Sequence, residues 1–164
     1  MVTIRTARLV LRRARMDDLP EIYALLSNPV GMRYWSTPPH TAIAQSEAWL
    51  RSMVEADPAV SDDFIIEKDG TAIGKLGCFT LPEIGFHLAS AHWGQGYASE
   101  AMAAYLDRRR GIGKPQILTA DVDPRNGASL RLLERHGFVE TGRASGTWQV
   151  GDELCDSVYL GLRL

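Results

Sequence analysis

The feature that most constrains this chain is a glycine-bearing loop between an apolar run and a helical segment. Ile84–Leu88 has the length and composition of a buried strand, and a helical pattern begins at Ala98. Gly94 and Gly96 lie in the loop between them. A helix N-terminus presents unpaired N–H groups and a partial positive charge, and glycines let a ligand approach them closely. The pattern therefore predicts a diphosphate site.

Two other interpretations of this loop stay open on local pattern alone. Paired glycines before a helix are often only a tight turn. The dinucleotide fingerprint Gly-x-Gly-x-x-Gly also begins this way, and an acidic residue, Asp121, follows at a suitable distance. Here Ser99 stands where the third glycine belongs, so that match is incomplete.

The rest of the chain predicts strands and helices in alternation within a single domain, residues 1–164. An Asp69-Gly70 pair marks a tight hairpin turn, and Thr41 is a candidate helix cap. The expected strands are 6–15, 64–67, 72–79, 84–88, 117–122, 138–141 with 146–150, and 156–164. The expected helices are 17–26, 41–53, 98–110 and one that opens at Asn126 or Gly127 and ends before Gly137. This order predicts an α/β layered domain on a mixed sheet.

Composition narrows the class of protein. The 164 residues are 45% hydrophobic and 23% charged, with a net charge of -2, which is typical of a globular protein and argues against a nucleic-acid surface. No apolar run approaches the roughly 18 residues of a membrane span, and no signal-peptide core is seen, so we expect no membrane partner. Two cysteines and four histidines without metal-ligand spacing predict no metal and a reducing, cytoplasmic setting.

Nearly the whole chain resembles the GNAT acetyltransferase superfamily, and most closely its ribosomal-protein-alanine N-terminal acetyltransferase branch. The matching segments, in order, are 6–12, 32–35, 38–41, 84–88 with 93–101, 126–129, 132–134, 136–138 and 156–159. The resemblance implies a mixed, mostly antiparallel sheet of six to seven strands with about four helices. In that fold the two central parallel strands splay apart, and acetyl-CoA binds in the gap as co-substrate.

The resemblance also implies which residues hold acetyl-CoA. Backbone N–H groups of the glycine loop would bind the pyrophosphate, and the strand before it would pair with the pantetheine arm. The cofactor-binding residues implied are His87, Leu88, Trp93, Gly94, Gln95, Gly96, Tyr97, Ala98, Ser99, Asn126 and Ser129.

The implied reaction is transfer of the acetyl group to a primary amine by direct attack, which needs a base, an oxyanion donor and an acid. We expect Glu83 as the base, although it can equally be an exposed loop carboxylate; His87, Asp121 and Glu100 are other candidates. The N–H of Leu88 is the expected oxyanion donor. Many family members use a tyrosine as the acid where this chain has Leu133, so Ser129 is the expected catalytic substitute.

The acceptor amine stays open between a protein N-terminus, an amino acid, a polyamine and an aminoglycoside. Tyr34, Trp35 and Trp148 are expected to bind it, or else to belong to the core. Two other functions are weighed: a non-catalytic acyl-CoA-binding regulatory domain and a nicotinamide-nucleotide oxidoreductase. A homodimer is possible, because dimers are the commonest assembly.

Overall fold

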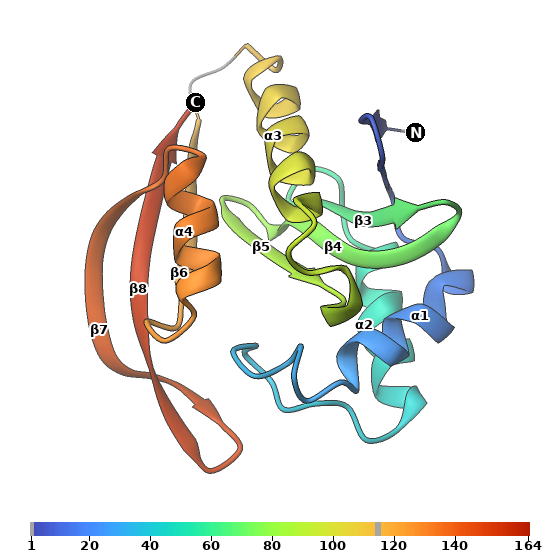
Figure 1. Ribbon diagram of the computed structural model, residues 1–164, viewed down its shortest axis with the longest axis horizontal. Coiled ribbons are helices and arrows are strands. Elements are labelled where there is room, and N and C mark those ends of the chain that lie inside the picture. The colour runs from blue at the N-terminus through green and yellow to red at the C-terminus, as the bar shows by residue number, and fades with distance from the viewer. Residues whose placement is uncertain (1, 114–115) are drawn as a thin grey trace.

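A computed structural model describes residues 2–113 and 116–164, and its framework is one eight-stranded sheet (Figure 1). The strands are β1 Thr3–Arg5, β2 Val10–Arg12, β3 Asp62–Lys68, β4 Thr71–Thr80, β5 Glu83–Leu88, β6 Ile117–Val122, β7 Val139–Val150 and β8 Glu153–Arg163. Their spatial order is β1-β2-β3-β4-β5-β6-β8-β7, and β5–β6 is the parallel pair among antiparallel ones. The predicted mixed, mostly antiparallel sheet is confirmed, with eight strands rather than six or seven.

Helices cover both faces of this sheet. The four α-helices are α1 Leu19–Leu26, α2 Ile43–Val54, α3 Tyr97–Arg110 and α4 Gly127–Arg135, with single 3-10 turns at Met16–Asp18 and Ser90–His92. Because strand side chains alternate, β3 sends Phe64 and Ile66 into the core beneath α3 and α4, and Ile65 into a second core with α1 and α2. All three side chains are at most 1% exposed.

The parallel strands β5 and β6 meet at only one end. Within the described part of the chain, Glu83 opposite Thr119 is their one paired position, where the Thr119 N–H also donates to the Pro82 carbonyl at 3.0 Å. Beyond it the two strands diverge, and Figure 1 shows β6, β8, β7 and α4 as one half of the molecule and β1 to β5 as the other. The predicted splay is thus present.

The N-terminal segment departs from prediction. In place of one strand over 6–15, two three-residue strands form an antiparallel pair, with Ile4 opposite Leu11. A turn separates them, in which the Leu9 N–H donates to the Thr6 hydroxyl at 2.9 Å. The Thr6 hydroxyl in turn donates to Glu100 on α3 at 2.5 Å. A contact 94 residues away stabilises this turn, so period-two alternation alone did not reveal it.

Two further boundaries are corrected. Thr41 does not cap α2: Ala42 is the N-cap residue, and the Gln45 side chain accepts hydrogen bonds from the Thr41 and Ala42 N–H groups at 2.7 and 3.0 Å. The strand predicted over 138–141 with 146–150 is continuous as β7, Val139–Val150, and so includes residues 142–145; its register against β8 shifts twice. Those shifts interrupt the alternation that the prediction relied on.

The remaining predicted elements are confirmed to within three residues at either end. Asp69 and Gly70 have φ of 49° and 81°, as a tight hairpin turn with both central residues in the left-handed region requires. Asn126 is the N-cap of α4, and its side chain accepts a hydrogen bond from the Ser129 N–H at 3.2 Å. Gly137 ends that helix with φ of 91°.

Candidate active site

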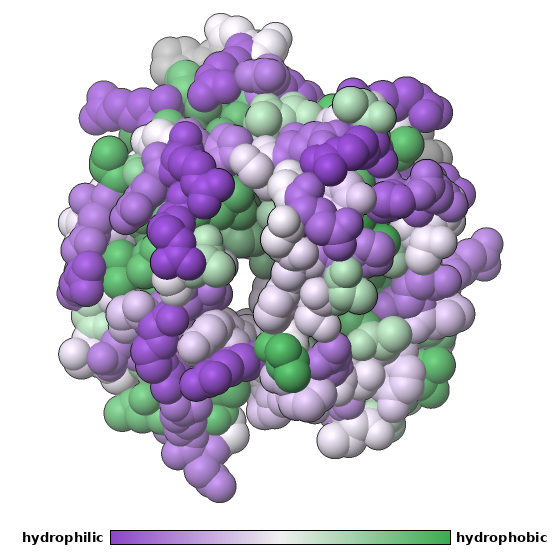
Figure 2. All heavy atoms as spheres, viewed as in Figure 1, coloured by the Kyte–Doolittle hydropathy of each residue, from purple (hydrophilic) through white to green (hydrophobic). Residues whose placement is uncertain are grey.

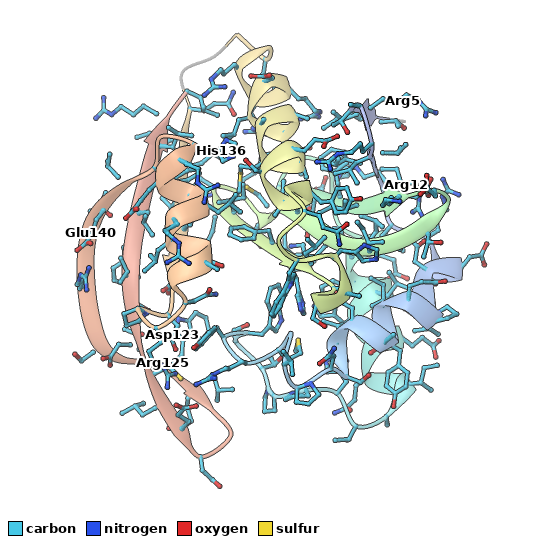
Figure 3. The ribbon with its side chains drawn as sticks, viewed as in Figure 1. Arg5, Arg12, Asp123, Arg125, His136 and Glu140 are labelled. Carbon is cyan, nitrogen blue, oxygen red and sulfur yellow. The ribbon has the colours of Figure 1, made fainter. Side chains whose placement is uncertain are left out.

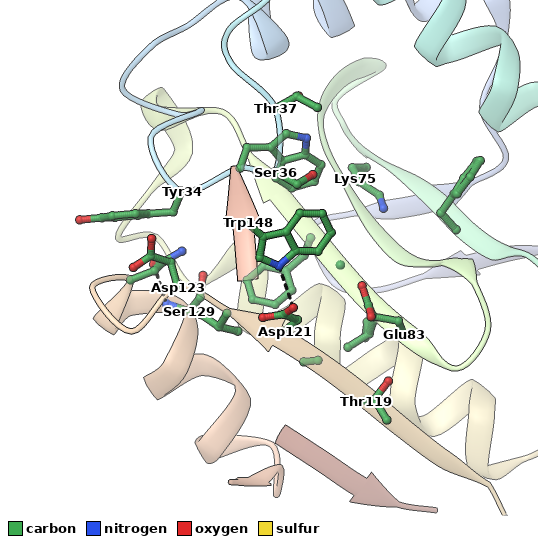
Figure 4. A pocket seen from close by; sticks show the side chains of 18 of the residues that line it. Tyr34, Ser36, Thr37, Lys75, Glu83, Thr119, Asp121, Asp123, Ser129 and Trp148 are labelled. Carbon is green, nitrogen blue, oxygen red and sulfur yellow. Dashed lines mark hydrogen bonds between the residues drawn. The ribbon is translucent and has the colours of Figure 1, made fainter. Parts of the chain in front are cut away.

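A cleft of about 680 Å³ occupies the gap where β5 and β6 separate (Figure 4). The space-filling view shows the surface opened between the two halves of the molecule (Figure 2). One wall is formed by the start of α4 and by β6, and the other by β5 and the segment between α1 and α2. Trp148 from β7 closes one side. The cleft therefore gives access to β5 from both halves of the protein.

The glycine loop beyond β5 is an open cradle at the N-terminus of α3. Gly94 and Gly96 have φ of 71° and 82°, a region that favours glycine. A Cβ on Gly94 would meet no atom within 4 Å, and on Gly96 it would meet only Arg8 Nη2, at 3.4 Å. The N–H groups of Tyr97, Ala98 and Ser99 have no acceptor among the described residues. An anion bound here would meet several free donors.

A residue that the sequence did not single out, Arg8, supports this cradle. Its Nη1 donates to the Gln95 carbonyl at 3.0 Å, its Nε lies 2.7 Å from Glu100 Oε2, and its guanidinium lies 4.5 Å from the centre of the Tyr97 ring (Figure 3 shows the side chains around α3). Although burial opposes it, hydrogen bonds from Thr6 and Arg8 hold the pKa of Glu100 below its usual value. Glu100 therefore has a structural role, not that of a base.

The side chains of the predicted cofactor-binding loop mostly shape the loop itself. Trp93 Nε1 donates to the Leu88 carbonyl at 2.7 Å, and Gln95 Nε2 donates to the Ala91 carbonyl at 3.1 Å. Ser99 Oγ lies 2.9 Å from His136 Nε2, which joins the start of α3 to the end of α4. What the loop offers a ligand is therefore its backbone.

The backbone of β5 also offers groups to the cleft. The Ala89 N–H donates to the Ile73 carbonyl of β4, so by antiparallel alternation His87 is bonded to β4 while Phe86 and Leu88 point away from it. Trp93 already occupies the Leu88 carbonyl, which leaves the Leu88 N–H facing the gap. Near the predicted pair His87 and Leu88, the backbone groups that face the gap therefore belong to Phe86 and Leu88, and those of His87 face β4.

The His87 side chain lies on the sheet face that packs against α1 and α2, as does that of Lys75, but it does not line the cleft. It is 6% exposed and packs on Trp35 with ring centroids 4.9 Å apart. Neither ring nitrogen has a hydrogen-bond partner among the described residues. Burial, together with the charge of Lys75, lowers the pKa of His87 to about 4. At neutral pH it is an uncharged, enclosed ring, which makes it a poor base for a substrate in the cleft.

Two carboxylates face each other across the closed end of the cleft. Burial, together with the negative charge of Asp121, raises the pKa of Glu83 above its ordinary value. Asp121 Oδ2 accepts a hydrogen bond from Trp148 Nε1 at 2.8 Å, as Figure 4 shows. A carboxylate with a raised pKa, still exposed to the cleft, has the properties of a general base.

The first two turns of α4 and its N-cap contribute Asn126, Ser129 and Leu133 to the cleft. These residues lie three, four and seven positions apart and so share one helix face. The Asn126 side-chain oxygen is engaged by the Ser129 N–H, so this asparagine caps the helix whatever else it binds. The Ser129 side chain points toward the cleft beside Asp123 in Figure 4.

The three aromatic residues predicted to meet the acceptor all line the cleft. Trp148 is 42% exposed. Trp35 lines the cleft and also packs against the second core, so both expectations, cleft wall and core, hold for Trp35. Tyr34 lies between two guanidinium groups, those of Arg33 at 5.2 Å and Arg125 at 5.7 Å from its ring centre. The sequence did not indicate this stack.

Comparisons with known proteins match this architecture. The acetyltransferase (GNAT) domain family matches residues 8–139. The uncharacterized N-acetyltransferase p20 of Bacillus licheniformis is 27% identical over 151 residues, 87% of this chain and 85% of p20. A solved acetyltransferase from Salmonella typhimurium, described as modifying the N-terminal serine of ribosomal protein L7/L12, has a TM-score of 0.87 and 17% identity over 99% of each chain. A spermidine N-acetyltransferase from Vibrio cholerae, solved with CoA and spermine, has a TM-score of 0.80 and 22% identity over 96% of each.

The chain therefore belongs to the GNAT acetyltransferase family, and its class is that of an acetyl-CoA-dependent N-acetyltransferase. This finding favours the enzyme over the non-catalytic alternative. The oxidoreductase interpretation is not supported, because a doubly wound dinucleotide fold needs several parallel strands, and the described part of the chain has one parallel pair. None of the helices in the described ranges is long and apolar enough to cross a membrane.

Proposed function

We propose that this enzyme acetylates a primary amine, of a protein N-terminus or of a small molecule, by direct attack inside the cleft between β5 and β6. The observation that carries the proposal is the single paired position, Glu83 with Thr119, beyond which the strands open. That opening brings the free edge of β5, a raised-pKa carboxylate and the start of α4 to one cleft, and the glycine loop at the start of α3 follows beyond the end of β5.

The hydrogen-bonding groups along β5 and the glycine loop suit acetyl-CoA. The cradle has positive φ at Gly94 and Gly96, open room where side chains would stand, and free N–H groups at the start of α3, all of which suit a pyrophosphate. The outward backbone groups of Phe86 and the N–H of Leu88 suit an extended arm that adds to a strand edge. Asn126 and Ser129 border the same cleft.

Three residues of the chain then have separate roles in the reaction. When bound, acetyl-CoA supplies a thioester, whose C–S bond breaks as the amine nitrogen forms its bond to the acetyl carbon. Glu83 accepts the proton that the amine loses, directly or through water. The Leu88 N–H stabilises the negative charge that develops on the carbonyl oxygen. The Ser129 hydroxyl hydrogen-bonds the departing thiolate and helps return a proton to it.

The acceptor would lie between Tyr34, Trp35 and Trp148, on the side of the cleft away from α3. Their aromatic faces exclude water from the reacting amine and can hold an apolar or cationic group. The two solved relatives act on a ribosomal protein N-terminus and on a polyamine, so both peptide N-termini and polyamines should be tested as acceptors.

The test is acetylation by the purified chain of a panel of peptides, amino acid amides and polyamines, with products identified by mass spectrometry. Calorimetric titration with acetyl-CoA, with NADH as comparison ligand, accompanies it. We expect acetyl-CoA binding and at least one acetylated amine. Tight binding with no product on any amine would favour a non-catalytic protein, and absence of acetyl-CoA binding would refute the proposal.

A further inference from the structure

A buried ion pair lies in the wall of the cleft where the core would ordinarily be apolar. Asp63 on β3 and Lys75 on β4 are 2% and 4% exposed, and both line the cleft. Their charged atoms, Oδ2 and Nζ, are 2.7 Å apart. Alternation puts both on the sheet face that carries Ile65 and packs against α1 and α2.

Stability alone does not account for this pair. Removing two charges from water is costly, and apolar residues of similar volume often stabilise a core as well or better. Burial raises the pKa of Asp63, and the Lys75 charge acts in the opposite direction, which is the expected signature of a carboxylate that depends on its partner. Because this ion pair is costly for stability and lies in the wall of a substrate cleft, a role in binding the substrate accounts for it better than a role in stability.

The ammonium of Lys75 has hydrogen-bonding capacity to spare. An ammonium has three N–H donors, and Asp63 is the one charged partner of Lys75 among residues 2–113 and 116–164. That contact is close but its angle is not that of a hydrogen bond, since Asp63 Oδ2 has no aligned donor. The Nζ lies 3.8 Å from the point where Gly85 would carry a Cβ. Because Gly85 has no side chain, nothing from that position covers the ammonium, and Lys75 (labelled in Figure 4) lines the cleft.

We infer that Lys75, held by Asp63, binds an oxygen atom of the acceptor, so that the acceptor is an α-amino carbonyl compound: an amino acid, its amide or a peptide N-terminus. This inference rests on the proposed function, because it assigns the amine end of the same molecule to Glu83. Polyamines have no oxygen for these donors, and a second ammonium beside Lys75 would be repelled.

The spacing along β5 suits such an acceptor. Gly85, beneath the ammonium, lies two residues beyond Glu83, which is about 6.6 Å along a strand. In an α-amino carbonyl compound the nitrogen and the oxygen are roughly 3 Å apart, as the standard backbone bond lengths dictate. With a hydrogen bond of about 2.9 Å at each end, such an acceptor reaches over about 9 Å. That reach is enough for the two-residue spacing along β5 even when the bonds are inclined to the strand.

The experiment compares matched acceptors with and without the carbonyl group. The double variant Asp63→Leu/Lys75→Met removes both charges while keeping the volume apolar, so it should fold. For phenylalaninamide we expect its kcat/KM to fall about 10- to 100-fold, as for loss of one hydrogen bond to a charged group. For phenethylamine we expect kcat/KM, and for acetyl-CoA the Kd, to change less than about 2-fold, and for spermidine we expect kcat/KM not to fall, because the repelling charge is removed.

A conservative variant and a stability measurement complete the test. Lys75→Arg retains the charge and donors, and is expected to keep a preference for phenylalaninamide over phenethylamine. Urea unfolding of each variant checks that the fold survives. An equal fall on both acceptors, or no fall on either, would overturn the inference and leave the acetyltransferase function standing. Absence of activity of the unaltered protein on every amine would instead refute the proposed function.

Discussion

Replacing Gly94 by alanine tests the pyrophosphate cradle with a control that the chain itself provides. Gly94 has φ of 71° and Gly70 has φ of 81°, and a Cβ on either would meet no atom within 4 Å. The conformational strain of alanine in this left-handed region, about 1 to 2 kcal/mol, should therefore lower the free energy of unfolding equally in both variants. Only Gly94 lies beside the helix N-terminus; Gly70 is in the β3–β4 turn.

The effect on ligand affinity should separate the two variants. A methyl group in the cradle displaces a phosphate from at least one backbone N–H, and a hydrogen bond to a charged group contributes about 1.5 to 3 kcal/mol. This corresponds to roughly a 10- to 100-fold weaker Kd for acetyl-CoA in Gly94→Ala, measured by calorimetry, and an unchanged Kd in Gly70→Ala. If both variants bind acetyl-CoA like the original chain, the pyrophosphate does not lie against this loop and the argument fails.

Two further predictions concern the cleft, and a third concerns the buried His87. Glu83→Gln should lower kcat/KM about 100-fold or more, and because activity needs the ionised carboxylate, the original enzyme should lose activity as pH falls through the raised pKa of Glu83 while the variant's pH–rate profile lacks that limb. Ser129→Ala should lower kcat and leave the acetyl-CoA Kd unchanged; unaltered turnover would remove Ser129 from the mechanism. His87 has a pKa lowered to about 4, so it contributes stability that is complete above about pH 6.5 and is lost, by up to roughly 3 kcal/mol, as pH falls toward 4. Urea unfolding at a series of pH values should show this part of the slope missing in His87→Leu.

The cradle could be predicted from the sequence because its determinants are local. An apolar strand, two glycines and a helix start follow one another within about twenty residues, and each has its own physical signature. The same holds for the Asp69-Gly70 hairpin and for the Asn126 cap. The roles assigned to Glu83 and Ser129 stay predictions, although the structure brings both residues to the cleft.

What the sequence did not reveal depends on residues far apart along the chain. Arg8 reaches Glu100 across 92 positions, and no local pattern distinguishes that arginine from its exposed neighbours. Lys75 lies in an otherwise apolar strand, where alternation predicts only which face it is on. That it meets Asp63, and that both face a cleft, follows from strand pairing and from the missing side chain at Gly85.

The splay of β5 from β6 explains why these features occur together. Continued pairing would satisfy the outward backbone groups of Phe86 and the N–H of Leu88, which a buried sheet normally requires. Leaving them open is costly unless a ligand or water takes the place of the missing strand. The same opening exposes the β5 edge to a cofactor arm from the side of α3 and to an amine from the side of α1 and α2. Glu83, at the one position where the strands still pair, is therefore fixed by the sheet at the closed end, where an amine entering the gap would have to stop.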